Sequence, residues 1–304
     1  MRATTPSATP VIVEGAATQV NQRVWIIAAL LTVYIIWGTT YLGIRFALES
    51  FPPYLLMGIR FTLAGSGLML FLRLRNTPMP TLRQVRGAAI VGTLLLVGGM
   101  GSVALAEQSV SSGLAATLVA TSPVWAMLFS MIWGGRPTRR EWIGVAFGVL
   151  GVALLSTEGS LQTNPLGIGL MLFATISWSL GSVWSRHLEM PKGAMANATE
   201  MLIGGVILVT FGLLRGERIV AMPTGSAVLA LLYLTTFGSL ATLTAYMFLL
   251  KTVSPALATS YALVNPAIAL FLGVLLGGEH ITGGALIALP IILLGIGFVA
   301  FRKR

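Results

Sequence analysis

The feature that most constrains this chain is an apolar stretch at residues 110–135, because the sequence contains it twice. Shifted by 143 positions, VSSGLAATLVATSPVWAMLFSMIWGG aligns with VSPALATSYALVNPAIALFLGVLLGG at 253–278, and 8 of the 26 positions are identical. Each copy includes an apolar run of about 20 residues, which is long enough for a helix to cross a bilayer. The fold must therefore contain two related membrane segments, far apart in the chain.

Each copy carries a proline near its middle, Pro123 in the first and Pro266 in the second. Proline lacks an N–H and its ring clashes with the preceding turn, so we expect each to interrupt its helix and act as a hinge. In lipid, an interrupted backbone is tolerated where neighbouring segments or a water-filled cavity satisfy the freed carbonyl groups. Interruptions at corresponding places in two halves are typical of transporters, which bind substrate between the repeats.

Composition agrees with a membrane protein. Hydrophobic residues make up 56% of the chain and charged residues 9%, and the mean hydropathy is +0.88. A soluble domain carries about 25% charged residues, so a soluble nucleic-acid-binding protein is excluded. We predict an all-α polytopic membrane protein with ten transmembrane helices. The expected spans are 24–44, 54–72, 87–106, 112–133, 142–157, 166–185, 194–214, 227–250, 256–276 and 283–301.

Charge placement predicts how these spans are threaded. Residues 1–22 are rich in Thr, Pro, Ala and Ser and are predicted to be a disordered cytoplasmic tail. With that tail inside, 15 of the 19 Lys and Arg residues fall on cytoplasmic segments, whereas the outer loops hold only Arg215 and Arg218. This distribution follows the positive-inside rule. Both termini are therefore expected in the cytoplasm.

The two halves are expected to be inverted repeats. Trp37 and Arg45 stand eight residues apart in the first span, and Trp178 and Arg186 stand eight apart in the sixth. Each half, 24–157 and 166–301, has five spans. Because five is an odd number, the second half enters the membrane from the opposite side. Such repeats are related by an axis in the membrane plane and enclose a central cavity.

Three runs carry a resemblance to a known family: YIIWGTTYLGIRFALESFPPYLLMGIRF, VATSPVWAMLFS and SPALATSYALVNPAIALFLGVLLGGE. Together they resemble EamA-type carriers of the drug/metabolite transporter superfamily, over nearly everything after about residue 24. The resemblance implies a ten-helix basket in the bacterial inner membrane and export of amino acids or other metabolites. The smallest relatives carry a glutamate in their first helix that binds cations. This chain has no acidic residue between Val24 and Arg45, which disfavours cationic-drug export by that route.

Aromatic and small polar side chains near mid-membrane are the candidates for substrate binding. An aromatic face can stack on an apolar solute, the indole N–H can donate to a carboxylate, and hydroxyls beside a proline break can bind polar groups. Helix packing is the alternative explanation for each of them. The predicted substrate-binding residues are Trp37, Thr40, Tyr41, Met100, Thr117, Thr121, Trp125, Trp178, Ser182, Tyr246, Tyr261 and Asn265.

Three charged residues near or within spans are candidates for charge pairing or ion coupling: Arg60, Glu107 and Glu200. Charges at membrane depth are costly and normally have a partner. Arg60 is expected to pair with Glu49 or Glu107, or to attract substrate carboxylates. Glu200 is expected to pair with Arg186 or Lys192, or to sense protons.

The chemistry available to the chain is limited. Asp is absent and the two histidines share no ligand spacing, so we expect no metal site, no cofactor and no intramembrane hydrolase. No repeated filter motif supports a channel. The preferred interpretation is a secondary exporter of small metabolites, most of all amino acids with aromatic or large apolar side chains, with sugars, purines and drugs as alternatives. Its expected partners are a small-molecule substrate and membrane lipid, with no nucleic acid, and a monomer is the working assumption.

Overall fold

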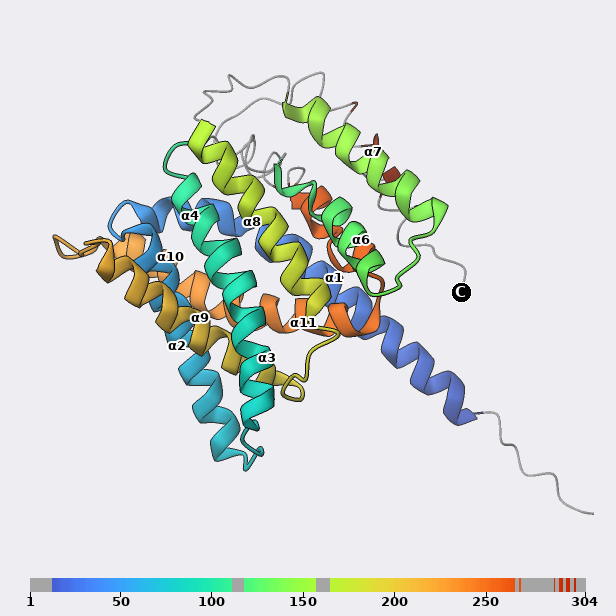
Figure 1. Cartoon of the computed structure of the whole chain (residues 1–304), viewed down its shortest axis with the longest axis horizontal. Helices are drawn as coiled ribbons and strands as arrows, with labels where there is room; N and C mark the ends of the chain where they lie inside the picture. Colours follow the sequence, from blue (N-terminus) through green and yellow to red (C-terminus); the bar gives the residue numbers. More distant parts are fainter. Residues whose placement is uncertain are drawn as a thin grey trace, which may run out of the picture.

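The computed structural model describes residues 13–110, 118–156 and 165–265, together with the isolated positions 268, 287, 290, 291, 294, 295 and 298. Every regular element within those ranges is helical. Figure 1 shows the helices crossing one another in a single bundle. Their bounds are α1 Val13–Leu48, α2 Pro53–Leu74, α3 Leu82–Gly92, η1 Thr93–Gly101, α4 Ser102–Ala106, α6 Ser122–Ile132, α7 Arg139–Ser156, α8 Pro165–Trp184, α9 Ala194–Leu214, α10 Gly225–Tyr233, η2 Leu234–Ala241, α11 Thr242–Thr252 and α12 Pro255–Ala258.

Six helical segments of the described chain are long and apolar enough to span a bilayer. They are Gln22–Leu48, Pro53–Leu74, Leu82–Ala106, Pro165–Trp184, Ala194–Leu214 and Gly225–Thr252. All six coincide with predicted spans, although α1 begins at Val13, inside the stretch assigned to a tail. An all-helical membrane protein is therefore confirmed, and the count of ten spans stays a prediction.

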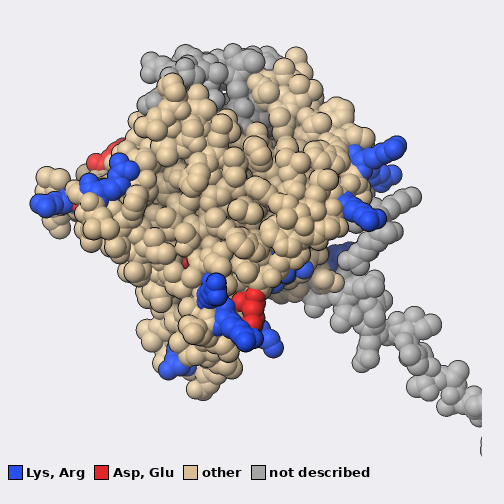
Figure 2. All heavy atoms as spheres, viewed as in Figure 1, with Lys and Arg blue, Asp and Glu red and all other residues tan. Residues whose placement is uncertain are grey.

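The outer surface suits lipid. In Figure 2 most of the visible face is uncharged, and Lys and Arg gather in a few groups. Large apolar side chains project outward along several spans, among them Ile27, Leu31, Ile35, Leu63, Leu70, Phe173, Leu229 and Phe237. Because water would penalise so much exposed apolar area, this surface indicates a hydrocarbon environment.

Two spans are interrupted by π-helical segments. The span Leu82–Ala106 contains η1, and the span Gly225–Thr252 contains η2. They occupy the third span of each half, so the internal repeat extends to backbone geometry. Within η2, Ser239 Oγ donates to the Leu234 carbonyl at 3.1 Å, and Thr242 Oγ1 donates to Phe237 O at 2.7 Å. These hydroxyls satisfy carbonyls that the widened helix leaves without a regular partner.

Helix α2 packs most extensively against α9 (Figure 1). Glycines allow the two backbones to approach closely. A Cβ at Gly65 would lie 2.4 Å from Leu202 N, and one at Gly205 would lie 2.5 Å from Thr62 N. Small residues at such contacts are the usual basis of helix association in membranes, where lipid removes the hydrophobic advantage of burying large side chains.

The proline interruption in the fourth span differs from the expected mid-helix kink. Helix α6 begins at Ser122, after a turn at Ala120 and Thr121, so that Pro123 lies in the first turn. At that position the missing N–H leaves no hydrogen bond unmade. In the ninth span, α12 ends at Ala258 and a turn precedes the helical residues 261–265. Pro266 lies outside the described residues.

Candidate functional site

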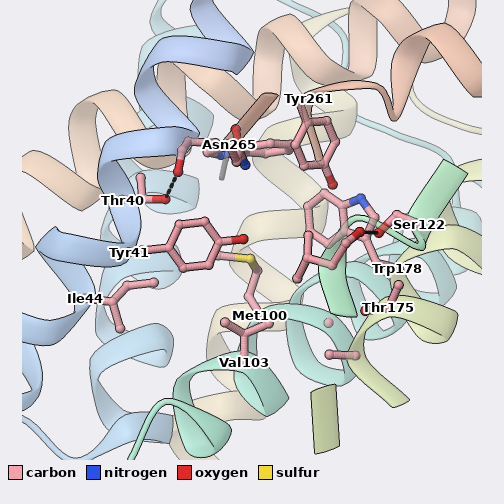
Figure 3. A pocket seen from close by; sticks show the side chains of 14 residues that line it. Thr40, Tyr41, Ile44, Met100, Val103, Ser122, Thr175, Trp178, Tyr261 and Asn265 are labelled. Atoms are coloured by element: carbon pink, nitrogen blue, oxygen red, sulfur yellow. Dashed lines mark hydrogen bonds between the residues drawn. The ribbon is translucent and has the colours of Figure 1, made fainter. Parts of the chain in front are cut away.

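A cavity lies between α1, the η1–α4 region, α6, α8 and the helical residues 261–265. Figure 3 shows its side chains converging from these separate elements. The lining residues are Trp37, Thr40, Tyr41, Ile44, Gly99, Met100, Val103, Val119, Ser122, Ala174, Thr175, Trp178, Tyr261 and Asn265.

Four aromatic rings pack together at one end of the cavity: Trp37, Trp178 and Tyr261, which line it, and Tyr246, which lies behind them. They are here called the aromatic cluster. The Trp37 ring centroid lies 5.3 Å from that of Trp178, 5.1 Å from that of Tyr246 and 4.6 Å from that of Tyr261. Edge-to-face and tilted contacts at these separations are favourable. The cluster is a packed wall contributed by α1, α8, α11 and the ninth span.

Hydrogen bonds fix the orientation of this wall. Trp37 Nε1 donates to Gly238 O at 3.2 Å, and Trp178 Nε1 donates to the Tyr246 hydroxyl at 3.0 Å. That hydroxyl also lies 2.6 Å from Ser182 Oγ. Both indole N–H groups are therefore used by the protein in this structure. The expectation that they donate to a substrate carboxylate does not fit this state, and the rings offer their apolar faces instead.

Some polar groups of the lining already have hydrogen-bond partners in the protein, and one does not. Thr40 and Thr175 donate their hydroxyls to carbonyls of their own helices, both at 2.8 Å, and Ser122 donates to Val119 O, just before α6, at 2.6 Å. Asn265 is 2% exposed, and its Oδ1 has no hydrogen-bond partner. An unpaired buried acceptor is costly unless a ligand uses it. Asn265 Oδ1 is thus suited to accept from a substrate N–H.

The cavity extends to one side of the aromatic cluster. Along α1 its lining runs from Trp37 to Ile44, toward the end of that helix. Along α8 the lining runs back from Trp178 to Ala174, toward the start of that helix. On the opposite side of the cluster, Arg186 Nη2 donates to Val253 O at 2.7 Å and joins the end of α8 to the α11–α12 connection. The cavity is therefore closed toward the end of α8.

Seven of the predicted binding residues line the cavity: Trp37, Thr40, Tyr41, Met100, Trp178, Tyr261 and Asn265. Ser182 and Tyr246 lie behind it and support Trp178. Thr121 and Trp125 bond each other, with Trp125 Nε1 donating to Thr121 Oγ1 at 3.2 Å, and do not line it. Thr117 lies outside the described residues.

Several lining residues were not among the predicted binding residues: Ile44, Gly99, Val103, Val119, Ser122, Ala174 and Thr175. A helical stripe through the tryptophans would have indicated some of them, because Thr175 and Ala174 precede Trp178 by three and four positions. Gly99 has a different role. A Cβ there would lie 2.9 Å from the Trp178 ring, so glycine lets that ring pack against η1.

Arg60 is buried, at 1% exposure, and the described residues give it no acidic partner. Its Nε donates to Ser239 Oγ at 2.7 Å, and its Cζ lies 4.9 Å from the Phe61 ring centroid. The expected pairing with Glu49 or Glu107 is therefore not found in that part of the chain. Its guanidinium instead stabilises the contact between α2 and η2.

The two candidate acids also lack ion pairs within the described ranges. Glu200 is fully buried, and neither carboxylate oxygen has a hydrogen-bond partner. Glu107 lies one residue beyond the span Leu82–Ala106, and its Oε1 has no partner. Burial raises the pKa of Glu107 to about 8. Among the described residues no cluster of His, Asp and Glu could hold a metal ion.

Similarity to known proteins identifies the class. The EamA-like transporter family matches residues 24–157 and again 165–301, which together are most of the chain. This protein belongs to that family. The uncharacterized inner membrane transporter YedA of Escherichia coli K12 is 44% identical to this EamA transporter over 284 residues, covering 93% of each chain. The resemblance read from the sequence is confirmed.

More distant comparisons agree. The uncharacterized transporter YoaV of Bacillus subtilis is 24% identical over 280 residues, covering 89% of this chain and 95% of YoaV. A solved crystal structure of another protein superposes with a TM-score of 0.75 at 20% identity, over 90% of this chain and 95% of that one. At that identity the likeness concerns the fold alone. The relatives are named as transporters, and their names give no substrate.

Proposed function

We propose that this EamA transporter exports small zwitterionic metabolites, most of all amino acids with aromatic or large apolar side chains, across the bacterial inner membrane. The observation that carries the proposal is the cavity itself. It combines an aromatic end, formed by Trp37, Trp178 and Tyr261, with one unpaired buried acceptor, Asn265 Oδ1. An apolar side chain suits the first feature and an ammonium group suits the second.

The charge of the lining supports a substrate with no net charge. No Lys, Arg, Asp or Glu is among the residues that line the cavity. A cation without a nearby acid, or an anion without a nearby base, would lose its hydration without compensation. A zwitterion presents both charges within one small group, so dipolar side chains can solvate it. Asn265 and Tyr41, whose side chains line the cavity in Figure 3, carry suitably polar groups.

The proposed architecture is ten spans in two inverted five-span repeats, with both termini in the cytoplasm. In that orientation α1 ends at the outer face, so the cavity described above opens outward and the aromatic cluster closes its inner end. Alternating access would then require α8 and α11 to separate where Trp178 and Tyr246 meet, while the outer ends close. The direction of export rests on the family resemblance.

Counterflow in proteoliposomes tests the proposal. Liposomes loaded with unlabelled leucine, phenylalanine or tryptophan should take up the same labelled amino acid transiently and saturably, because a carrier exchanges substrate without net drive. Parallel liposomes loaded with glucose, adenine or ethidium represent the sugar, purine and drug alternatives. Liposomes containing the Asn265→Leu variant provide the site control, and their counterflow should weaken.

Each result discriminates between the alternatives. Saturable counterflow of amino acids alone supports the proposal. Counterflow of adenine, glucose or ethidium without amino acids would transfer the same cavity to that solute class. Non-saturable flux with no counterflow would indicate a pore rather than a carrier.

A further inference from the structure

A second polar site lies on α9, outside the substrate cavity. Glu200 is 0% exposed, and both of its carboxylate oxygens lack a hydrogen-bond partner. Helix α3 covers it closely, since a Cβ at Gly92 would lie 2.7 Å from Glu200 O. A bare carboxylate in such surroundings is expensive, so this group has a reason to be there other than packing.

Asn197 lies one helical turn before Glu200, and its side chain also has a polar atom without a hydrogen-bond partner. It is 2% exposed, its Nδ2 donates to Thr244 Oγ1 on α11 at 3.0 Å, and its Oδ1 has no partner. Side chains three apart on a helix are neighbours. An unpaired acceptor therefore lies beside a carboxyl group that has nothing to donate while it is ionised.

One proton satisfies both groups. A protonated Glu200 carries an O–H donor, and Asn197 Oδ1 is the neighbouring acceptor. With the Asn197–Thr244 hydrogen bond already present, such a contact would extend a hydrogen-bonded chain from Glu200 on α9 to α11. A metal cation fits less well, because Thr244 Oγ1 already accepts from Asn197 and the described side chains offer too few free oxygens for a coordination shell.

We propose that Glu200 is a proton-carrying site, with Asn197 and Thr244 as its hydrogen-bonded link to α11. The carboxylate takes up one proton from one side of the membrane and releases it to the other, and no other reactant is needed. Coupling of this proton to substrate rests on the proposed transport function. The proton site itself does not.

The charged and titratable groups on the helices packed against α9 define its surroundings. Helix α2 carries Tyr54, Arg60 and Arg73, α3 carries Arg83 and Arg86, and η1 carries none. On α11 stand Tyr246 and the exposed Lys251, whose charge acts on the Glu200 carboxyl. Lys251 is thus placed to stabilise the ionised form when the α9–α11 contact opens.

The proton site and the substrate cavity are connected through one helix, α11. Thr244 and Tyr246 stand two residues apart on α11, and Tyr246 closes the cavity by accepting from Trp178 Nε1 at 3.0 Å. A change in the α9–α11 bond therefore acts on the same helix that holds the closed end. Protonation favours the α9–α11 bond and the arrangement seen here, and deprotonation favours separation.

Carbodiimide labelling tests the proton site without any substrate. Dicyclohexylcarbodiimide adds to protonated carboxyl groups in apolar surroundings and spares ionised ones. The purified protein in liposomes is labelled from about pH 5 to about pH 9, a range that spans ordinary and raised carboxyl pKa values, and adducts are mapped by peptide mass spectrometry. We expect an adduct on Glu200 whose yield falls as the pH rises. No adduct at any pH, or a yield independent of pH, would overturn the proposal.

A transport measurement tests whether the proton on Glu200 is coupled to substrate movement. Flux of labelled phenylalanine is measured with and without a pH gradient, for the wild type, Glu200→Gln and Glu189→Gln. In Glu200→Gln the new amide keeps the size of the protonated acid and can donate to Asn197, so folding should be preserved. The gradient should accelerate the wild type and Glu189→Gln, whose exposed carboxyl is the matched control, and the response should be lost in Glu200→Gln.

The outcomes separate this proposal from the preceding one. A Glu200→Gln variant that responds to the gradient as the wild type does would overturn the proton site, and so would flux that requires sodium instead of a pH gradient. If no amino acid is transported, the proposed function fails and the labelling result alone decides the proton site.

Discussion

Residues that line one cavity contribute to it by different means. Trp37 and Trp178 are held by mutual ring contacts and by hydrogen bonds to Gly238 and Tyr246. Asn265 Oδ1 has no such support. Truncating a tryptophan therefore disturbs the protein and its substrate together. Changing Asn265 removes an acceptor that no described group uses, together with a side-chain contact to the Tyr41 hydroxyl, so it should affect binding more than folding.

The first prediction concerns Asn265→Leu. A hydrogen bond to a charged group contributes about 1.5–3 kcal/mol, so substrate affinity should fall roughly tenfold to a hundredfold. The melting temperature should change less than the affinity does, because Oδ1 bonds nothing in the substrate-free protein and only the contact with the Tyr41 hydroxyl is lost. The measurements are counterflow half-saturation and thermal unfolding in detergent. Ser122→Ala is the control, because the Ser122 hydroxyl already donates a hydrogen bond to Val119 O at 2.6 Å. Equal loss of affinity in both variants would contradict the assignment.

The second prediction concerns Glu107. Burial raises the pKa of Glu107 from 4.5 to about 8, so the folded protein holds this proton more tightly than the unfolded chain. Stability from this group is complete below about pH 4.5 and is lost as the pH rises through about 8. Thermal unfolding followed from pH 5 to pH 9 should show a fall that is shallower in Glu107→Gln. The exposed Glu49→Gln should behave as the wild type does, and an unchanged slope in Glu107→Gln would refute the idea.

At the residue scale, the sequence predicted the positions of side chains that recur in the internal repeat. Trp37 and Trp178 hold equivalent places in two related spans, so their position near the middle of the bundle followed from counting. Hydrogen-bond partners did not follow. Trp125 lies at similar depth, yet its N–H is used locally by Thr121, and no spacing rule distinguishes that case from a cavity residue.

At the scale of elements, the two π-helical segments are the least predictable feature. The run Gly98–Gly101 contains three glycines and so permits a bend, but nothing in it specifies a π-helix. That geometry depends on partners supplied by the fold, such as Ser177 Oγ of α8, which donates to Leu94 O at 2.8 Å. The apolar spans, by contrast, depend mainly on their own composition, and six of them coincide with described helices.

The third prediction tests the α2–α9 contact. In Gly65→Ala the new methyl group would meet the backbone of Leu202 at 2.4 Å, and backbone atoms cannot rotate away. We expect a loss of about 1–3 kcal/mol and a lower melting temperature. Gly67→Ala on the same helix is the matched control, because nothing lies within 4 Å of its Cβ position. Similar melting temperatures for the two variants would show that the close contact is not limiting.

At the scale of the whole molecule, the asymmetric distribution of Lys and Arg carries information that the packing of helices does not. Packing determines which spans are neighbours, whereas loop charge determines which face each loop occupies during insertion. The count of ten spans and the inversion of the two halves are therefore joint predictions. An error of one span would place half of the basic loops on the wrong face.

The last prediction uses the absence of cysteine from the chain to test this threading. Arg75 and Arg218 are both exposed and stand 143 positions apart, which is the repeat offset. They occupy the same loop of the two halves. Inverted repeats place equivalent loops on opposite faces, so a membrane-impermeant maleimide applied to intact cells should label Arg218→Cys and spare Arg75→Cys until the membrane is permeabilised. The cysteine-free parent gives the background. Labelling of both variants from the same side would show that the halves are parallel, and the proposed alternating-access mechanism would lose its symmetry.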